Sequence, residues 1–189
     1  MKRLAIFASG SGSNAENIAK YFRKRSGAKI SIILTNNPKA FVIDRAAQLK
    51  IPVEVFDRTT FYDSNKILKK LQEAEIDMII LAGFLWLVPQ NLLKAYPEKI
   101  INIHPALLPK YGGKGMYGMK VHEEVIRNQE KESGITIHYV DECYDEGCII
   151  FQATCEVLPN DTAQTLADRV HKLEYRHFPE VIESLVMKS

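Results

Sequence analysis

Short apolar runs alternate with amphipathic stretches along the first hundred residues, and this pattern constrains the fold more than any other feature of the chain. The apolar runs end in turn residues, whereas the amphipathic stretches carry their apolar side chains at helical spacing. We expect strands at 4–8, 29–35, 53–56, 76–82 and 100–104, separated by helices at 14–25, 40–49, 60–74 and 89–96. Repeated β-α units of this kind predict an α/β fold with an open, mostly parallel, doubly wound (Rossmann-like) sheet.

The second half of the chain departs from this strict alternation after a glycine-rich loop at 112–118, which is a candidate mobile lid. We expect a helix at 120–128, strands at 134–140 and 147–157, and a long closing helix at 162–185. Asp161 is the expected cap of the closing helix, and Pro179 is expected to kink or break it. Strand 76–82 is the most apolar and is expected at the centre of the sheet. Ligands of such sheets bind beyond the carboxyl ends of the strands.

Length, composition and charge describe an ordinary globular protein. A chain of 189 residues corresponds to roughly one domain, so residues 1–189 are expected to form a single domain. Hydrophobic residues make up 46% and charged residues 25%, which are typical globular values. The net charge of +2 gives no reason to expect nucleic acid or a membrane surface as the main partner.

Cysteine spacing and apolar-run length indicate the compartment. The three cysteines form no CxxC pair, which favours a reducing compartment without a structural zinc site. The longest apolar run, 78–88, has 11 residues, whereas a membrane helix needs about 20. The apolar run at 4–8 is too short for a signal peptide. We therefore expect a cytoplasmic protein.

A glycine-rich segment, Ser9-Gly-Ser-Gly-Ser-Asn14, joins the first expected strand to the first expected helix. Backbone amides at such a helix start, together with the helix dipole, form an anion site. The segment also fits a relaxed dinucleotide fingerprint, which needs an acidic residue about 20 positions later to hold the ribose. No Asp or Glu occurs between Asn17 and Val42. The sequence therefore predicts a site for a single phosphate group, and an ordinary tight turn is the competing interpretation.

Two polar residues, Asn102 and His104, stand at the carboxyl end of an otherwise apolar strand. Their spacing of two places both side chains on one face of that strand. An Asn amide can donate to a developing oxyanion, and a His can donate or relay a proton near neutral pH. No Ser stands in a nucleophile elbow, which favours direct acyl transfer between two bound substrates. The competing interpretation is a satisfied core His beside an Asn that caps a turn.

An acidic loop at 141–147 offers a third member for this site. A carboxylate close to His104 would raise the pKa of the imidazole. The residues alone do not choose among Asp141, Glu142, Asp145 and Glu146, and acidic loops are commonly just solvated.

Histidines elsewhere give weaker signals. The role of His138, on the strand before the acidic loop, is open, whereas His122, His171 and His177 on expected helices are interpreted as structural or solvated. His171 and Glu174 face the same side of the last helix. No His-Glu-x-x-His or Pro-Cys-x-x-Cys pattern occurs, so no metal site is expected.

Four motifs make the chain resemble the glycinamide ribonucleotide transformylases, also called phosphoribosylglycinamide formyltransferases, of the folate-dependent formyltransferase family. The motifs are Ser9-Gly-Ser-Gly-Ser-Asn14, Leu81-Ala-Gly-Phe84, Asn102-Ile-His-Pro-Ala-Leu-Leu-Pro109 and Asp145-Glu-Gly147. The third is highly specific for enzymes that use formyltetrahydrofolate, and the first favours the ribonucleotide member among them. The resemblance covers essentially the whole chain and implies the formyltransferase fold.

The resemblance implies roles for individual residues. It implies that Asn102 binds the formyl oxygen, that His104 is the proton donor, and that Asp145 tunes His104 and orders a water. Glycinamide ribonucleotide would contact Gly12, Ser13 and Asn14 through its phosphate and Glu174 through its glycinamide end. The folate would lie against Leu85, Trp86, Leu87 and Val88, largely through backbone groups, with Arg58 and His138 as further candidate contacts.

The implied reaction transfers a formyl group from 10-formyltetrahydrofolate to the amine of 5-phosphoribosylglycinamide in de novo purine biosynthesis. It passes through a tetrahedral intermediate and needs no metal, and its partners are these two small molecules. One alternative is formyltetrahydrofolate hydrolase, which is expected to carry a further domain ahead of the catalytic one, and 189 residues leave no room for it. A non-catalytic folate or nucleotide sensor is the other alternative, and it would not need Asn102, His104 and Asp145 together.

Overall fold

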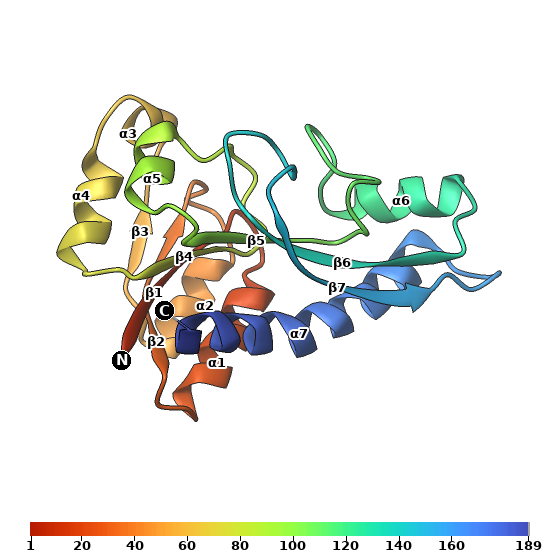
Figure 1. The fold of residues 1–189 in the computed structure, drawn as a ribbon, viewed down its shortest axis with the longest axis horizontal. Helices are drawn as coiled ribbons and strands as arrows, with labels where there is room; N and C mark the ends of the chain where they lie inside the picture. Colours follow the sequence, from red (N-terminus) through yellow and green to blue (C-terminus); the bar gives the residue numbers. More distant parts are fainter. Residues whose placement is uncertain (189) are drawn as a thin grey trace.

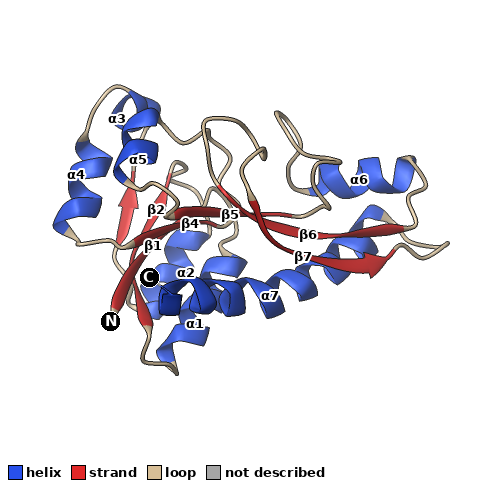
Figure 2. Cartoon of the chain, viewed as in Figure 1, coloured by secondary structure: helices blue, strands red, loops and turns tan. Residues whose placement is uncertain are grey.

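One seven-stranded sheet organises the chain, and a computed structural model describes its residues 1–188 (Figures 1 and 2). The strands are β1 (Lys2–Phe7), β2 (Ala28–Thr35), β3 (Val53–Val55), β4 (Met78–Leu81), β5 (Ile100–His104), β6 (Glu132–Tyr139) and β7 (Ile149–Glu156). The helices are α1 (Ser13–Arg23), α2 (Val42–Leu49), α3 (Arg58–Tyr62), α4 (Lys66–Glu73), α5 (Gln90–Ala95), α6 (Met119–Arg127) and α7 (Ala163–Lys188).

The strand order is β3-β2-β1-β4-β5-β6-β7. Strands β1 to β5 pair in parallel, whereas β6 and β7 are added as antiparallel strands at one side. The expected α/β fold with an open, mostly parallel sheet is confirmed, and β4 is its central strand as the apolar pattern predicted. The direction of chain progression reverses between β1 and β4, and ligands of such folds bind at this switch point.

Two hydrophobic clusters lie on opposite faces of the sheet. Along β1, Leu4 and Ile6 belong to one cluster, whereas Ala5 and Phe7 belong to the other. The first cluster takes in buried residues of α1, α2 and α7, and the second takes in those of α3, α4 and α5. Figure 2 shows these two sets of helices on either side of the strands. Because side chains alternate along a strand, residues 4–7 of β1 must all be apolar to serve both faces.

The expected single helix at 60–74 is instead two helices, α3 and α4. Asp57 caps α3, since its Oδ1 accepts a 2.7 Å hydrogen bond from the Thr60 amide. Ser64 then interrupts the helical pattern, because its hydroxyl donates to the Thr60 carbonyl at 2.7 Å and accepts from the Lys66 amide at 3.3 Å. Short polar side chains that bond the local backbone in this way compete with helix continuation.

The cap of α7 also differs from the expectation. Thr162, and not Asp161, accepts a hydrogen bond from the Thr165 amide, at 3.2 Å. The Asp161 carboxylate instead accepts from the Leu158 amide at 2.7 Å and pairs with the Arg169 guanidinium at 2.6 Å. The helix then continues through Pro179 to Lys188, so this proline does not break it.

We expect Asp161→Asn to destabilise the fold in a pH-dependent way. Hydrogen bonds from Arg169, together with those from the Leu158 amide and Thr165, hold the pKa of the Asp161 carboxyl well below its usual range. A carboxyl with a depressed pKa stabilises the native state above its unfolded pKa, near 4, and loses that effect as the pH falls. Urea titration at pH 7 should show a loss of about 1 kcal/mol in the free energy of unfolding, since Arg169 stays partly exposed.

The matched control for this prediction is Asp168→Asn, an exposed carboxylate on α7, the helix that follows Asp161. It should leave the free energy of unfolding at pH 7 unchanged. The difference between Asp161→Asn and the unmodified protein should also shrink below pH 4. A difference that is the same at pH 7 and pH 3 would contradict the ionic origin of the effect.

Candidate active site

The segment between β1 and α1 is shaped around Gly12, which stands at the start of the helix with φ 71°. A Cβ at Gly12 would overlap the side chain of Val42, so both the backbone angle and the space require glycine. This segment is joined to the one after β4, because the Ser9 amide donates to the Gly83 carbonyl at 2.9 Å and the Leu85 amide donates to the Ser9 hydroxyl at 3.1 Å. The amides at the start of α1 thus face the switch point of the sheet.

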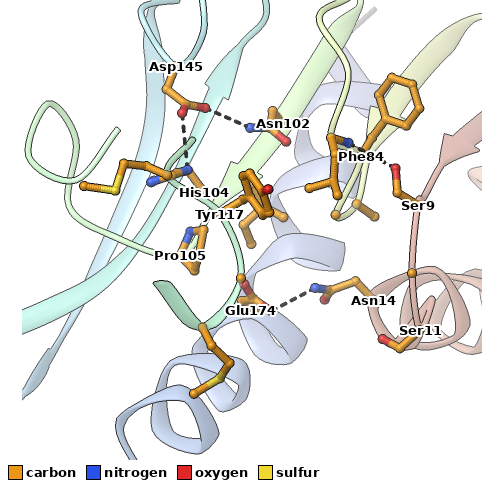
Figure 3. A pocket seen from close by; sticks show the side chains of 18 of the residues that line it. Ser9, Ser11, Asn14, Phe84, Asn102, His104, Pro105, Tyr117, Asp145 and Glu174 are labelled. Atoms are coloured by element: carbon orange, nitrogen blue, oxygen red, sulfur yellow. Dashed lines mark hydrogen bonds and ion pairs between the residues drawn. The ribbon is translucent and has the colours of Figure 1, made fainter. Parts of the chain in front are cut away.

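A cavity of about 690 Å³ opens at this point, at the carboxyl ends of β1, β4 and β5. It brings together residues that are distant in the sequence (Figure 3). The predicted site residues in its wall are Gly12, Ser13, Asn14, Leu85, Asn102, His104, Asp145 and Glu174. The glycine segment and the Asn-His pair therefore share one cavity, as strand-end placement predicted.

Asn102 and His104 face Asp145, which comes from the segment between β6 and β7 (Figure 3). His104 Nδ1 lies 3.5 Å from Asp145 Oδ2, and Asn102 Nδ2 lies 3.4 Å from Asp145 Oδ1. The His104 ring is held from its other side, where Nε2–H donates to the Tyr111 carbonyl at 2.7 Å. The Gly113 amide donates to Asp145 Oδ2 at 3.0 Å and so fixes the carboxylate. Both contacts to Asp145 are long, as is common for catalytic groups without substrate.

Burial lowers the pKa of the His104 imidazole, and this outweighs the opposing effects of the Asp145 carboxylate and the Tyr111 carbonyl. The expectation that a nearby carboxylate raises this pKa holds for the effect of Asp145, but burial sets the net direction. Asp145 acts in the expected direction, but the loss of solvation is larger for a side chain that is only 4% exposed. The neutral imidazole of His104 is therefore favoured over the imidazolium by its burial in the free protein.

Asp145 stays ionised despite its partial burial. Burial by itself would raise the pKa of the Asp145 carboxyl, but the His138 and His104 imidazoles and the Gly113 amide lower it by more. A negative charge is therefore held beside His104 and Asn102. This charge favours the imidazolium form once His104 takes up a proton.

The other three carboxylates of the acidic loop point elsewhere. Asp141 accepts a hydrogen bond from the Cys143 amide at 2.9 Å, and Glu142 accepts one from Gln90 at 2.8 Å. Glu146 is exposed. Asp145 is thus the carboxylate of this loop that lies against His104.

Glu174, on α7, forms the opposite wall of the cavity (Figure 3). Its Oε2 accepts a 2.8 Å hydrogen bond from Asn14 Nδ2, so the start of α1 and the middle of α7 are tied together. Burial raises the pKa of the Glu174 carboxyl. A buried acid beside amide donors suits the binding of a polar, hydroxyl- or amine-bearing ligand.

Comparison with known proteins places these residues in a family. Residues 2–182 match the family model described as Formyl transferase. The chain belongs to the formyl transferase family. It is 39% identical to phosphoribosylglycinamide formyltransferase from Bacillus subtilis (strain 168), with 98% of this chain and 95% of that protein covered. The crystal structure of the phosphoribosylglycinamide formyltransferase from Bacillus Halodurans has a TM-score of 0.88 at 38% identity, covering 98% of this chain and 95% of that one.

A plant relative is longer. This formyl transferase is 42% identical to the chloroplastic phosphoribosylglycinamide formyltransferase of Vigna unguiculata over 97% of its own length. The match covers 61% of that relative, so the chain spans about three fifths of the plant protein.

Several predicted folate contacts of this formyl transferase lie outside the cavity wall. Leu85 lines the cavity, whereas Trp86, Leu87 and Val88 follow it along the chain and do not. The Leu87 carbonyl accepts a 2.9 Å hydrogen bond from the Tyr62 hydroxyl, which holds the segment in place. Its backbone is therefore fixed beside the cavity.

Trp86 belongs to an aromatic cluster on the α3 side of the sheet, with ring centroids 5.9 Å from Phe56 and 5.8 Å from Phe61. Arg58, the first residue of α3, lies over two rings, with its guanidinium carbon 5.1 Å from the Tyr62 centroid and 5.8 Å from that of Trp86. Arg58 thus borders this cluster and does not line the cavity. His138 lies behind Asn102, also outside the wall.

Sequence reasoning missed two histidines of the cavity wall. His122, at α6, is 2% exposed, and burial lowers its pKa to about 4. His171 lies one turn before Glu174 on α7 and faces the same cavity. The shared helix face of His171 and Glu174 was a usable signal, whereas the position of His122 depends on how the 112–118 segment leads into α6.

Within residues 1–188, no group of three or more His, Cys, Asp or Glu side chains is arranged to hold a metal ion. In the same part of the chain, no helix is both long and apolar enough to cross a membrane.

Proposed function

We propose that this formyl transferase moves the formyl group of 10-formyltetrahydrofolate to the amine of 5-phosphoribosylglycinamide in purine biosynthesis. The observation that carries the proposal is the shared cavity, in which a glycine-rich helix start faces Asn102, His104 and Asp145. The helix start suits a phosphate group, and the three side chains suit acyl transfer. The relatives named phosphoribosylglycinamide formyltransferase support the same pairing of substrates.

The roles of the residues follow from their positions. Amides of Gly12, Ser13 and Asn14 bind the phosphate, and Glu174 binds the glycinamide end of the same substrate. The segment from Leu85 to Val88 takes the pterin of the folate through its backbone, with Arg58 at its border. The formyl carbon then lies next to Asn102 and His104. Holding two substrates in this geometry contributes much of the rate, since effective molarities reach about 10⁵ M or more.

The transfer is a direct substitution at the formyl carbon. The amine nitrogen forms a bond to this carbon, and the electron pair of the C=O bond moves onto the oxygen. Asn102 Nδ2–H donates to that oxyanion. The negative charge also favours uptake of a proton from water at His104 Nδ1, and the imidazolium is a second donor that returns this proton to water when the intermediate collapses. As the intermediate collapses, the bond from carbon to the folate nitrogen breaks. The proton that the amine loses passes by way of Asp145 and water to the folate nitrogen.

The proposed setting of the enzyme is the cytoplasm, with residues 1–189 acting as one formyl transferase domain on two small-molecule substrates. The three cysteines, Cys143, Cys148 and Cys155, are free thiols, which suits a reducing compartment.

The test is to incubate the protein with 10-formyltetrahydrofolate, with and without 5-phosphoribosylglycinamide, and to follow the absorbance of the folate. We expect deformylation that depends on the ribonucleotide. A dephosphorylated ribonucleoside should react with a much higher KM, because it leaves the amides of the α1 start unpaired. Turnover without any ribonucleotide would indicate a hydrolase. No turnover in either mixture would contradict both the transferase and the hydrolase hypotheses.

A further inference from the structure

We infer that His138 is a positioning residue of the proposed formyl transfer, and that it fixes which end of the Asn102 amide serves the formyl oxygen. His138 lies on β6, directly opposite Asn102 of β5 in the antiparallel register. Its side chain is 2% exposed and lies outside the cavity wall. It therefore acts through Asn102 and not on the folate itself.

The hydrogen bonds of His138 determine its tautomer. Nδ1 lies 2.8 Å from the carbonyl oxygen of Tyr139, and a carbonyl can only accept, so Nδ1 carries the proton. In the neutral ring Nε2 is then an acceptor. This acceptor lies 3.1 Å from Asn102 Nδ2, so the amide of Asn102 donates to it. The ring thereby selects one of the two orientations of the Asn102 side chain.

The selected orientation leaves the donor where the transfer needs it. One N–H of Asn102 is held by His138, and the second points toward Asp145 Oδ1 at 3.4 Å, which is a long and weak contact. The second N–H is therefore available to the formyl oxygen. With the amide rotated by half a turn, the Asn102 carbonyl oxygen would face both Asp145 and the developing oxyanion, and the interactions would be repulsive.

A competing arrangement would place the proton on Nε2 and direct it to Asp145, and a hydrogen bond of this kind would contribute to the lowered pKa of the Asp145 carboxyl. Nε2 lies 3.5 Å from Asp145 Oδ1, which is longer than its 3.1 Å distance to Asn102 Nδ2. That arrangement would also set the lone pair of Nδ1 against the Tyr139 carbonyl at 2.8 Å. The distances therefore favour the proton on Nδ1.

The backbone around His138 holds the Tyr139 carbonyl in a fixed position. The register of β6 and β7 shifts between Ile137 and His138, which is the irregularity of a β-bulge. Gly147 packs so closely on the Tyr139 carbonyl that no side chain fits between them. The acceptor that holds the His138 ring is thus fixed by the neighbouring backbone.

Two substitutions separate the two hydrogen bonds of the ring. In His138→Gln, the side-chain oxygen can take the place of Nε2 and accept from Asn102. In His138→Asn, the shorter amide can take the place of Nδ1 and donate to Tyr139, but nothing accepts from Asn102. We expect His138→Gln to keep kcat within about 5-fold of the unmodified enzyme. We expect His138→Asn and His138→Leu to lose roughly 10²-fold in kcat, as when an oxyanion donor is lost, with KM little changed.

A purely structural role would give a different pattern. Equal kcat values for His138→Gln and His138→Asn, or a loss that appears in KM and not in kcat, would overturn the inference. Thermal unfolding of the three variants shows whether each one folds. The kcat values test the inference only if the proposed function is correct. A second measurement therefore tests the state of His138 without any turnover.

That measurement is a long-range ¹H–¹⁵N spectrum of the ligand-free protein labelled with ¹⁵N-histidine. We expect the spectrum of neutral His138 to show the proton on Nδ1, which is the rarer tautomer in solution. A proton on Nε2 would overturn the inference whatever the enzyme activity. If the unmodified protein shows no formyl transfer, the proposed function fails, and the spectrum still decides the state of His138.

Discussion

Replacing His104 with alanine is expected to lower kcat by about 10³-fold while folate binding stays nearly unchanged. The imidazole is buried at the end of β5, where Tyr111 holds one ring nitrogen and Asp145 faces the other. Alanine removes the proton donor of the intermediate but leaves the pterin-binding backbone in place. The loss should therefore appear in kcat and not in the dissociation constant of the folate.

Trp86 provides the binding measurement for this variant. It is the single tryptophan of the sequence and belongs to the segment proposed to bind the pterin. Titration with tetrahydrofolate should quench its fluorescence equally in His104→Ala and in the unmodified protein. The matched control is His177→Ala on α7, whose ring contacts Phe151 and lies outside the cavity wall. Rates like those of the unmodified enzyme in His104→Ala would remove His104 from the mechanism.

Replacing Gly147 with alanine is expected to lower the free energy of unfolding by about 3 kcal/mol and to reduce kcat as well. A Cβ at Gly147 would overlap the carbonyl oxygen of Tyr139, and a backbone atom cannot turn aside as a flexible side chain can. The strand must therefore shift, although the Tyr139 amide also donates to the Cys148 carbonyl at 2.9 Å. Because the Tyr139 carbonyl holds the His138 ring, the shift also disturbs Asn102.

Urea unfolding followed by circular dichroism measures the first effect, and the formyl-transfer rate measures the second. The matched control is Gly27→Ala, where an added Cβ meets open space and the backbone angle suits any residue. We expect this control to unfold at nearly the same urea concentration as the unmodified protein. A Gly147→Ala protein as stable as this control would show that the β6–β7 connection can relax around a side chain.

Local patterns in the sequence were sufficient to predict the strands of the sheet and about half of the site residues. Apolar runs and their spacing determine which segments become strands, and period two alone places Asn102 and His104 on one face of β5. The wrong prediction of one helix at 60–74 also has a local cause. The Ser64 hydroxyl forms hydrogen bonds with the local backbone, and these compete with continuation of the helix. The spacing of apolar residues at 60–74 does not reveal this competition.

The rest of the site depends on pairings between distant strands. His138 faces Asn102 only because β6 lies antiparallel to β5 in one particular register. Asp145, among four neighbouring carboxylates, reaches His104 because its own backbone takes a left-handed conformation, with φ 57°. Neither the register nor this backbone angle is encoded in a short window of sequence. The resemblance to a known family selected Asp145, whereas the residues by themselves did not.

The hydrogen bond between Asn14 and Glu174 joins residues that are 160 positions apart. Its consequence concerns the order in which the protein is made. A ribosome completes the phosphate-binding segment early, whereas the Glu174 side chain that faces it is synthesised 160 residues later, with α7. Such distant contacts carry a large entropic cost of closure and form late in folding. Until α7 has packed against α1, the glycine-rich segment lacks the wall that Glu174 supplies, so the cavity is complete only after that packing step.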